Sequence, residues 1–438
     1  MGKAYAEWLV RWRYLILVAT IILVAATGSG LQFIAFKTDY RVFFSEDNPQ
    51  LKAFEQLQNT YTKTDNVLFV LAPKDGNVFT PATLASIARL TEAAWQIPYS
   101  IRVDSITNYQ HTEAEEDDLI VADLVAEEEL DDLDEAALQR IRKIATNEPL
   151  LVNHLISGTG HVTGINVTIQ LPDDTTGKEV PEITAFSREL VEQVKAGNPE
   201  LDVYLTGMVI MNNSFPEVSI HDQQTLVPMV FGIIVLTLVL LLRSFVATVG
   251  TFLIIIFSIL TAMGLAGWAG IPLTPPSAAS PTIIMTLAVA DCVHILVTFL
   301  HSMQGGLDKR AAMVESIRIN LQPVFLTTLT TIIGFLSMNF SDAPPFRDLG
   351  NIVATGVAAA FVFSLTFLPA LMLVLPVRVR AKTAQKVQLV DRFAEMVIAR
   401  RSFLFWGMGI IVITLVSFVP RNELNDEFIK YFDETVDF

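Results

Sequence analysis

The sequence predicts a membrane α-helical bundle that carries a large external α+β domain. Of its 438 residues, 52% are hydrophobic and only 17% are charged, and the mean hydropathy is +0.47, which is unusual for a soluble globular enzyme. Long uncharged runs lie on both sides of one mixed polar segment, 37–222. A single cysteine, Cys292, excludes an intrachain disulfide and a multi-cysteine zinc site.

Uncharged runs predict about seven transmembrane helices, because a bilayer core of roughly 30 Å is spanned by about 20 apolar helical residues. The runs cover 14–36, 223–242, 244–290, 319–341, 349–377 and 402–420. The third run has 47 residues and contains the proline-rich segment 270–276, so it is expected to form two helices, the second at 281–300. Residues 223–377 are thus predicted to form a bundle of five helices.

Lysine and arginine residues near the span ends orient the chain. Fourteen of them lie in 1–13, 243, 309–318 and 378–401, whereas Arg347 is alone in the two short loops on the other side. The positive-inside rule therefore places the N-terminus 1–13 and the basic linker 378–401 in the cytoplasm, and 37–222 outside. The first span is expected to be an uncleaved anchor and not a signal peptide, because it has 23 residues and Gly28-Ser29-Gly30 is a poor cleavage site.

The external segment 37–222 contains two predicted strand–helix–strand units. The first has strands at 66–71 and 101–106 with a helix from Thr80-Pro81 to Trp95, and the second has strands at 162–171 and 201–206 with a helix at 181–195. Two units of this size predict paired ferredoxin-like layers.

An acidic insert, 112–135, separates the two units and supplies most of the net charge of −16. It holds thirteen acidic residues and no basic ones, with Leu119, Val121, Leu124 and Leu130 interspersed. We expect a solvated helix here; a cation site is the alternative, although no EF-hand spacing occurs. Because the acidity is local and no basic patch accompanies it, a nucleic-acid partner is not expected.

A weak internal repeat has an offset of 388 residues. Arg13 aligns with Arg401, each directly before an apolar span. An aromatic cluster also aligns, with Tyr40, Phe43 and Phe44 matching Phe428, Tyr431 and Phe432. The repeat predicts that 402–420 begins a second copy of the architecture and that 421–438 begins a second external domain. Chance similarity of two helix starts is the alternative.

One acidic residue, Asp291, lies inside a predicted span. It is the only acid between Asp222 and Asp308, and it lies near the middle of 281–300. A carboxylate at this depth costs about 3 kcal/mol or more unless it is protonated, paired or hydrated. Because desolvation favours the neutral acid, the group can bind and release a proton as its hydration changes. Asp291 is therefore the candidate proton relay; a static interhelical hydrogen bond is the alternative.

Other polar and small residues of the spans are candidates for supporting roles. His294, three residues after Asp291, is a second relay candidate or an ordinary packed histidine. The relay-supporting candidates are Thr327, Thr328, Thr330 and Thr331, which are expected to bond either Asp291 and its waters or their own backbone carbonyls. Glycines are expected to allow close helix packing, or to line a substrate path, at Gly264, Gly267, Gly334, Gly350 and Gly356.

The layout of one span, an external domain, five clustered spans, a basic linker and a repeated span resembles the first half of a resistance-nodulation-division (RND) transporter. It is most similar to the lipid-handling branch, which includes the mycobacterial membrane protein large (MMPL) exporters, the hopanoid transporters and Patched. The segment 287–291, Leu-Ala-Val-Ala-Asp, is similar to the family's Gly-x-x-x-Asp, and 326–335 is similar to its Thr-rich, Gly-Phe segment. Leu287 replaces the usual glycine and Cys292 replaces a tyrosine or a second aspartate, so the partners of Asp291 remain open.

The resemblance implies a bacterial inner-membrane exporter of a lipid-like substrate, with a sterol-sensing-like bundle and a periplasmic domain. The proton gradient is then the energy source, with no bound cofactor, and a matching acid in the second half of the transporter completes the relay. Membrane lipids, that second half and a possible homo-oligomer are the expected partners.

Two alternatives remain from the residues themselves: a lipid- or sterol-sensing receptor without net transport, and an accessory subunit for protein export. An enzyme is not expected, because no Ser-His-Asp, metal or P-loop spacing occurs. The stretch 307–321 is amphipathic and predicts a helix that lies on the inner membrane surface.

Overall fold

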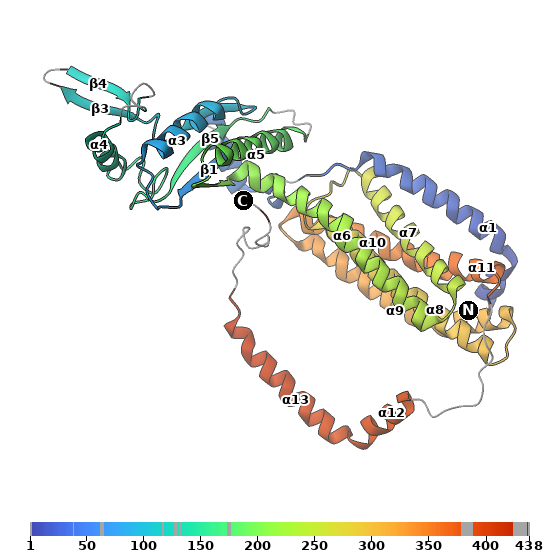
Figure 1. Cartoon of the computed structure of the whole chain (residues 1–438). Coiled ribbons are helices and arrows are strands. Elements are labelled where there is room, and N and C mark those ends of the chain that lie inside the picture. Colours follow the sequence, from blue (N-terminus) through green and yellow to red (C-terminus); the bar gives the residue numbers. More distant parts are fainter. Residues whose placement is uncertain are drawn as a thin grey trace.

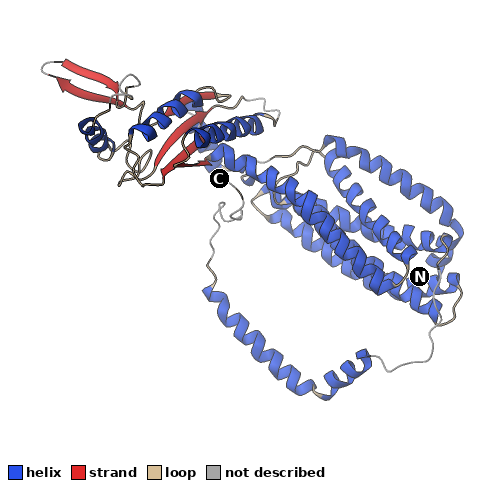
Figure 2. Cartoon of the chain, in the orientation of Figure 1, coloured by secondary structure: helices blue, strands red, loops and turns tan. Residues whose placement is uncertain are grey.

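The computed structural model describes residues 2–37, 39–61, 65–115, 118–126, 130, 133–172, 177–377, 389–423 and 436. Its helices form an elongated bundle, and an α/β domain lies at one end of this bundle (Figure 1). Figure 2 shows that the strands gather in the α/β domain. Within the described residues, seven helices are long and apolar enough to cross a membrane, in agreement with the predicted number.

The membrane helices follow the predicted runs, with shifted ends. They are α1 (Gly2–Gly28), α6 (Met208–Leu242), α7 (Phe245–Trp268), α8 (Ser280–Gln304), α9 (Lys309–Leu336), α10 (Pro344–Leu365) with α11 (Phe367–Val374), and α13 (Arg401–Phe418). The predicted break within 270–276 is confirmed, because α7 ends at Trp268 and α8 begins after a short 3₁₀ turn. The helix α1 begins twelve residues before the predicted span 14–36, so most of 1–13 is helical.

The predicted surface helix at 307–321 is not a separate element. It is the first part of α9, and Met313 and Ile317 are buried in the bundle core. The hydroxyl of Ser316 donates to the carbonyl oxygen of Ile295 at 2.6 Å. The prediction is wrong because the small and polar side chains of this stretch pack against α8, and amphipathic periodicity alone does not distinguish that contact from a membrane surface.

Glycines allow α7 to touch the first span backbone to backbone. A Cβ at Gly264 would overlap the carbonyl oxygen of Thr27, and a Cβ at Gly267 would overlap that of Gly30, in the 3₁₀ turn η1 (Ser29–Phe33) that continues α1. No side chain larger than hydrogen fits at either contact. The predicted packing role of these two residues agrees with the geometry.

The remaining predicted glycines divide into two groups. In α10, a Cβ at Gly350 would overlap the carbonyl oxygen of Phe335, and one at Gly356 would overlap the side chain of Ile284. Gly334 has no atom within 4 Å of an added Cβ and is exposed. Its predicted packing role is wrong for the described part of the chain, because this face of α9 is turned away from the neighbouring helices.

Four antiparallel strands form the sheet of the external domain. They are β1 (Asn66–Pro73), β2 (Ser100–Asp104), β5 (Thr163–Ile169) and β6 (Leu201–Thr206), in the order β2-β5-β1-β6. The helices α3 (Pro81–Ala94) and α5 (Glu179–Gly197) pack side by side (Figure 1). The Thr80 hydroxyl caps α3 by accepting from the Thr83 amide at 3.2 Å, so the predicted helix start is confirmed.

The two strand–helix–strand units share one sheet and do not form paired layers. Strand β5 of the second unit lies between β1 and β2 of the first. Ile165, Val167 and Ile169 of β5 are fully buried. A strand this apolar is stabilised by neighbours at both edges, which explains why the units interleave. Pairing between units is a long-range contact that the local pattern does not contain.

The predicted helix in the acidic insert is wrong. Residues 110–115 and 118–123 pair as a hairpin of β3 (Gln110–Glu115) and β4 (Asp118–Asp123), which projects from the domain before α4 (Glu135–Ala145) (Figures 1 and 2). Thr112 pairs with Val121 and Glu113 with Ile120. Thr112, Ile120 and Val121 are β-branched and favour strands, and the cross-strand contacts outweigh the helical spacing of the leucines. Residues 116–117, 127–129 and 131–132 of the insert lie outside the described residues.

A continuous helix joins the sheet to the membrane bundle. Strand β6 ends at Thr206, Gly207 has a φ of +115°, and α6 then runs for 35 residues, or roughly 50 Å. The Asn66 side chain accepts from the Met208 backbone amide at 3.1 Å and donates to the side-chain oxygen Oδ1 of Asn166 at 2.7 Å. Asn66 therefore links the start of α6 to β1 and β5 by hydrogen bonds.

At the other end of the chain, α12 (Leu389–Ala399) and α13 lie apart from the bundle (Figure 1). No residue of α13 is buried. The 3₁₀ turn η6 (Val419–Arg421) follows α13. The aromatic residues of the predicted repeat, Phe428, Tyr431 and Phe432, lie outside the described residues, so that part of the alignment remains a prediction.

Candidate functional site

Asp291 lies on α8 at the contact with α9. Its side chain is buried, with 8% of the residue exposed. The hydroxyl of Thr328 in α9 donates to Oδ2 of Asp291 at 3.3 Å. No second hydrogen bond or ion pair of this carboxyl occurs among the residues that the structure describes. A buried carboxylate with one hydroxyl partner is under-solvated, so it requires a proton, water or a further partner.

Only one of the four predicted threonines contacts Asp291. Thr327 donates to the carbonyl oxygen of Pro323 at 3.1 Å, Thr330 to Leu326 at 3.0 Å and Thr331 to Thr327 at 2.8 Å. The two expected roles are thus divided: Thr328 bonds the carboxyl group, and the other three bond their own helix.

His294 is exposed and turns away from the described bundle. It lies one helical turn from Asp291, but no described hydrogen bond joins the two side chains. The structure therefore does not place His294 in the buried environment of Asp291, and its relay role remains a prediction. Cys292, next to the aspartate, is fully buried in the bundle core.

The sequence prediction missed a polar seam that extends from Asp291 along the α8–α9 contact. Three polar residues of α9, Ser316, Asn320 and Thr328, are buried, and each bonds a residue of α8. The Asn320 side chain donates to the Thr298 hydroxyl of α8 at 2.9 Å. The signal for this seam is the i, i+4 spacing of polar residues within an otherwise apolar stretch.

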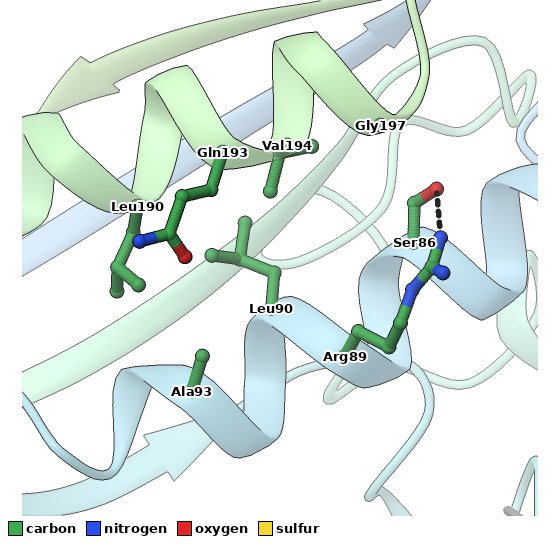
Figure 3. A pocket seen from close by; sticks show the side chains of 8 residues that line it. All are labelled: Ser86, Arg89, Leu90, Ala93, Leu190, Gln193, Val194 and Gly197. Atoms are coloured by element: carbon green, nitrogen blue, oxygen red, sulfur yellow. Dashed lines mark hydrogen bonds between the residues drawn. The ribbon is translucent and has the colours of Figure 1, made fainter.

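Hollows in the described part of the chain lie away from Asp291. A groove of about 230 Å³ lies between α3 and α5, and its lining includes Leu90 and Leu190. Figure 3 shows these side chains between the two helices, with Arg89 bonded to Ser86. Ligand pockets for drug-sized molecules are usually about 300–1,000 Å³, so this groove is too small to hold a whole lipid. A second hollow, of about 340 Å³, lies between α1 and α7 and has an apolar lining that includes Val24 and Phe257.

A family model described as the MMPL family matches residues 43–415. The chain belongs to the MMPL family. The matched region of this MMPL-family protein contains the whole four-stranded sheet, Asp291 and Thr328. The family resemblance that the layout and the two segments around these residues predicted is therefore confirmed.

A relative of this MMPL-family protein is found in Methanocaldococcus jannaschii, under the name "Putative membrane protein MJ1562". It is 21% identical over 364 residues, which are 82% of this chain and 90% of that protein. The similarity thus extends over most of both chains. The family match and the seven apolar helices together identify this chain as a multi-pass membrane protein.

Proposed function

We propose that this protein is a proton-driven transporter that exports a lipid-like substrate from a bacterial inner membrane, with 37–222 in the periplasm. It acts by transport and not by chemical conversion. The observation that carries the proposal is the buried carboxyl of Asp291, which has a single hydroxyl partner in the middle of a membrane helix. Protonation changes the charge of this group, and thereby its need for solvent.

The protonation of Asp291 is coupled to the external domain through a series of helices that pack against one another. Neutral Asp291 is compatible with a closed α8–α9 contact, whereas the carboxylate favours an arrangement that admits water or a partner. Helix α6 packs against α7 and α8. It is tied to α5 by Arg188 and Glu217, whose two hydrogen bonds are 2.8 and 2.9 Å long. A shift of α8 would thus move α6 and, through Asn66, the sheet.

A matching second repeat completes the relay in this proposal. With the offset of 388, α1 and η1 correspond to the consecutive helices α12, α13 and η6, which supports a repeated architecture. His294 and Thr330 are exposed on the α8–α9 surface, and polar side chains in a membrane span are stabilised by a protein neighbour. This neighbour is the second half of the transporter or a second copy of the chain.

The external sheet order β2-β5-β1-β6 supports a single ferredoxin-like layer as the moving part. The apolar hollow between α1 and α7 supports a substrate with a hydrocarbon portion, because its lining would solvate acyl chains. Both features fit the lipid-handling branch of the superfamily. A lipid sensor of the same family would use the hollow in the same way but would not require Asp291 to titrate.

The test is movement of a fluorescent acyl phospholipid by the full-length protein in vesicles with an imposed pH gradient. We expect movement that requires the gradient and is lost in Asp291→Asn, which keeps the shape of the side chain but removes its titration. Asp308→Asn is the matched control, because Asp308 is exposed in the loop before α9. Equal transport by Asp291→Asn and the native protein would overturn the relay. Lipid binding without movement in the native protein would favour the sensor.

A further inference from the structure

A pair of cations without a described acidic partner lies at the predicted cytoplasmic end of the bundle. There α1 packs against α9 and α11, and this contact brings Arg13 close enough to Lys309 for their charges to repel each other. The Nε atom of Arg13 is buried and has no hydrogen-bond partner among the described residues. Lys309 donates from Nζ to the carbonyl oxygens of Leu373 and Leu375.

The nearby carboxylates do not neutralise this pair. Asp308 accepts from the backbone amide of Arg310 at 3.2 Å and is exposed. Glu315 pairs with Arg318 at 2.6 Å. No ion pair of Arg13 or Lys309 with a carboxylate occurs in the described ranges. A guanidinium with a buried, unpaired N–H donor next to a second cation has the charge and the hydrogen-bonding capacity to bind an anion.

Aromatic residues next to Arg13 indicate which kind of anion can reach this end of the bundle. Trp8, Trp12 and Tyr14 flank Arg13 on α1, and each is between 43% and 61% exposed. Exposed tryptophan and tyrosine at the end of a membrane helix are typical of the headgroup region. The guanidinium of Arg13 also lies 4.9 Å from the Tyr14 ring centroid. An anion at this level would therefore belong to the membrane.

We propose that Arg13, supported by Lys309, binds the phosphate of an anionic lipid headgroup of the inner leaflet at the α1–α9–α11 junction. The bound phosphate neutralises the repulsion between the two cations and accepts hydrogen bonds from the Arg13 guanidinium group. It thereby holds α1 against α9 and α11. This site is separate from Asp291 and does not depend on the transport proposal.

The test is native mass spectrometry of the full-length, delipidated protein in detergent with added phosphatidylglycerol or phosphatidylcholine. We expect the native protein to prefer phosphatidylglycerol, and Arg13→Gln to lose about tenfold in that preference, the size expected for a hydrogen bond to a charged group. Arg11→Gln removes the same charge two residues away on the opposite, exposed side of α1, and should change the preference less than about twofold. Arg13→Lys keeps the charge and should retain part of the preference.

Two results would overturn the proposal. Equal losses in Arg13→Gln and Arg11→Gln would mean that only general surface charge attracts the lipid. Displacement of phosphatidylglycerol by inorganic phosphate at the same concentration would mean that the junction binds a free anion and not a headgroup. The thermal unfolding of each variant without lipid, compared with the native protein, separates loss of binding from loss of folding.

Discussion

The Thr328 hydroxyl donates to the Asp291 carboxyl across the α8–α9 contact, at 3.3 Å. This relationship depends on the rotation of α9 about its axis. The same rotation turns Thr327 and Thr330 outward, where each bonds a carbonyl of its own helix. Thr328 stabilises the charged form of Asp291, whereas Thr327 and Thr330 bond only their own helix. Single substitutions of these threonines can therefore distinguish the two roles.

Replacing Thr328 with valine should reduce proton-driven transport by about tenfold. Valine has nearly the same shape, so the variant removes the hydrogen bond to the carboxyl group with little change in packing, and such bonds contribute roughly 1.5–3 kcal/mol. The measurement is the initial rate of lipid movement in vesicles. Thr328→Ser should restore most of the rate, and Thr327→Val should leave it unchanged. If Thr327→Val reduced the rate as much as Thr328→Val, the specific bond would not matter.

Gly264→Ala should destabilise the bundle by about 1–3 kcal/mol, because the new methyl group overlaps the carbonyl oxygen of Thr27 and forces α7 away from α1. Thermal unfolding of the purified protein in detergent measures the effect. Gly334→Ala is the control: its methyl group meets no atom within 4 Å, and alanine favours the helix. Its midpoint should equal or exceed that of the native protein. Similar losses in both variants would contradict the packing role of Gly264.

Gly207→Ala should weaken the junction between the sheet and α6. The φ of +115° is unfavourable for alanine, and its Cβ would lie 2.6 Å from the carbonyl oxygen of Asn66. We expect faster hydrogen exchange at the start of α6 and in β1. Gly158→Ala, in a loop of the same domain with no atom within 4 Å of the added Cβ, should exchange like the native protein. Unchanged exchange in Gly207→Ala would show that the junction tolerates the strain.

The hairpin of the acidic insert should loosen from α4 in acid. The hydrogen bond from Arg140 lowers the pKa of Glu113 below its ordinary value of 4.5. Because the pKa is lowered on folding, the contact contributes fully above the unfolded pKa of 4.5 and is lost as the pH falls through the folded pKa. The protection factors of 110–115 against hydrogen exchange, which correct for the intrinsic effect of pH on the exchange rate, should therefore fall in that acidic range. Glu113→Gln should exchange faster already at pH 7, whereas Asp118→Asn should not; the same exchange rate in both variants would contradict a specific tether.

Much of the architecture was predictable because the relevant signals are local. The length of an apolar run decides whether a helix can span a bilayer, and prolines in 270–276 end α7 wherever it packs. The capped start of α3 after Thr80 is also contained in a few adjacent residues. Asp291 stands out for the same reason, since one acid in an apolar helix is conspicuous whatever surrounds it.

The errors concern contacts between distant segments. The leucine spacing in 112–135 fits a helix, but cross-strand pairs such as Thr112 with Val121 decide for a hairpin. The amphipathic face of 307–321 fits a membrane surface as well as a helix neighbour, and the Ser316 bond to α8 selects the neighbour. A local pattern specifies that a face is apolar or polar, but not which surface it will meet.

The sequence by itself determined the membrane spans, the two strand–helix–strand units and the single intramembrane acid, because each depends on the transfer of short segments from water and on local hydrogen bonding. The tertiary structure decided the interleaving of the strands, the glycines that touch another helix and the choice of Thr328 as the partner of Asp291. These features depend on the relative rotation and position of elements. Helical periodicity fixes which residues share a face, and only packing decides what that face contacts.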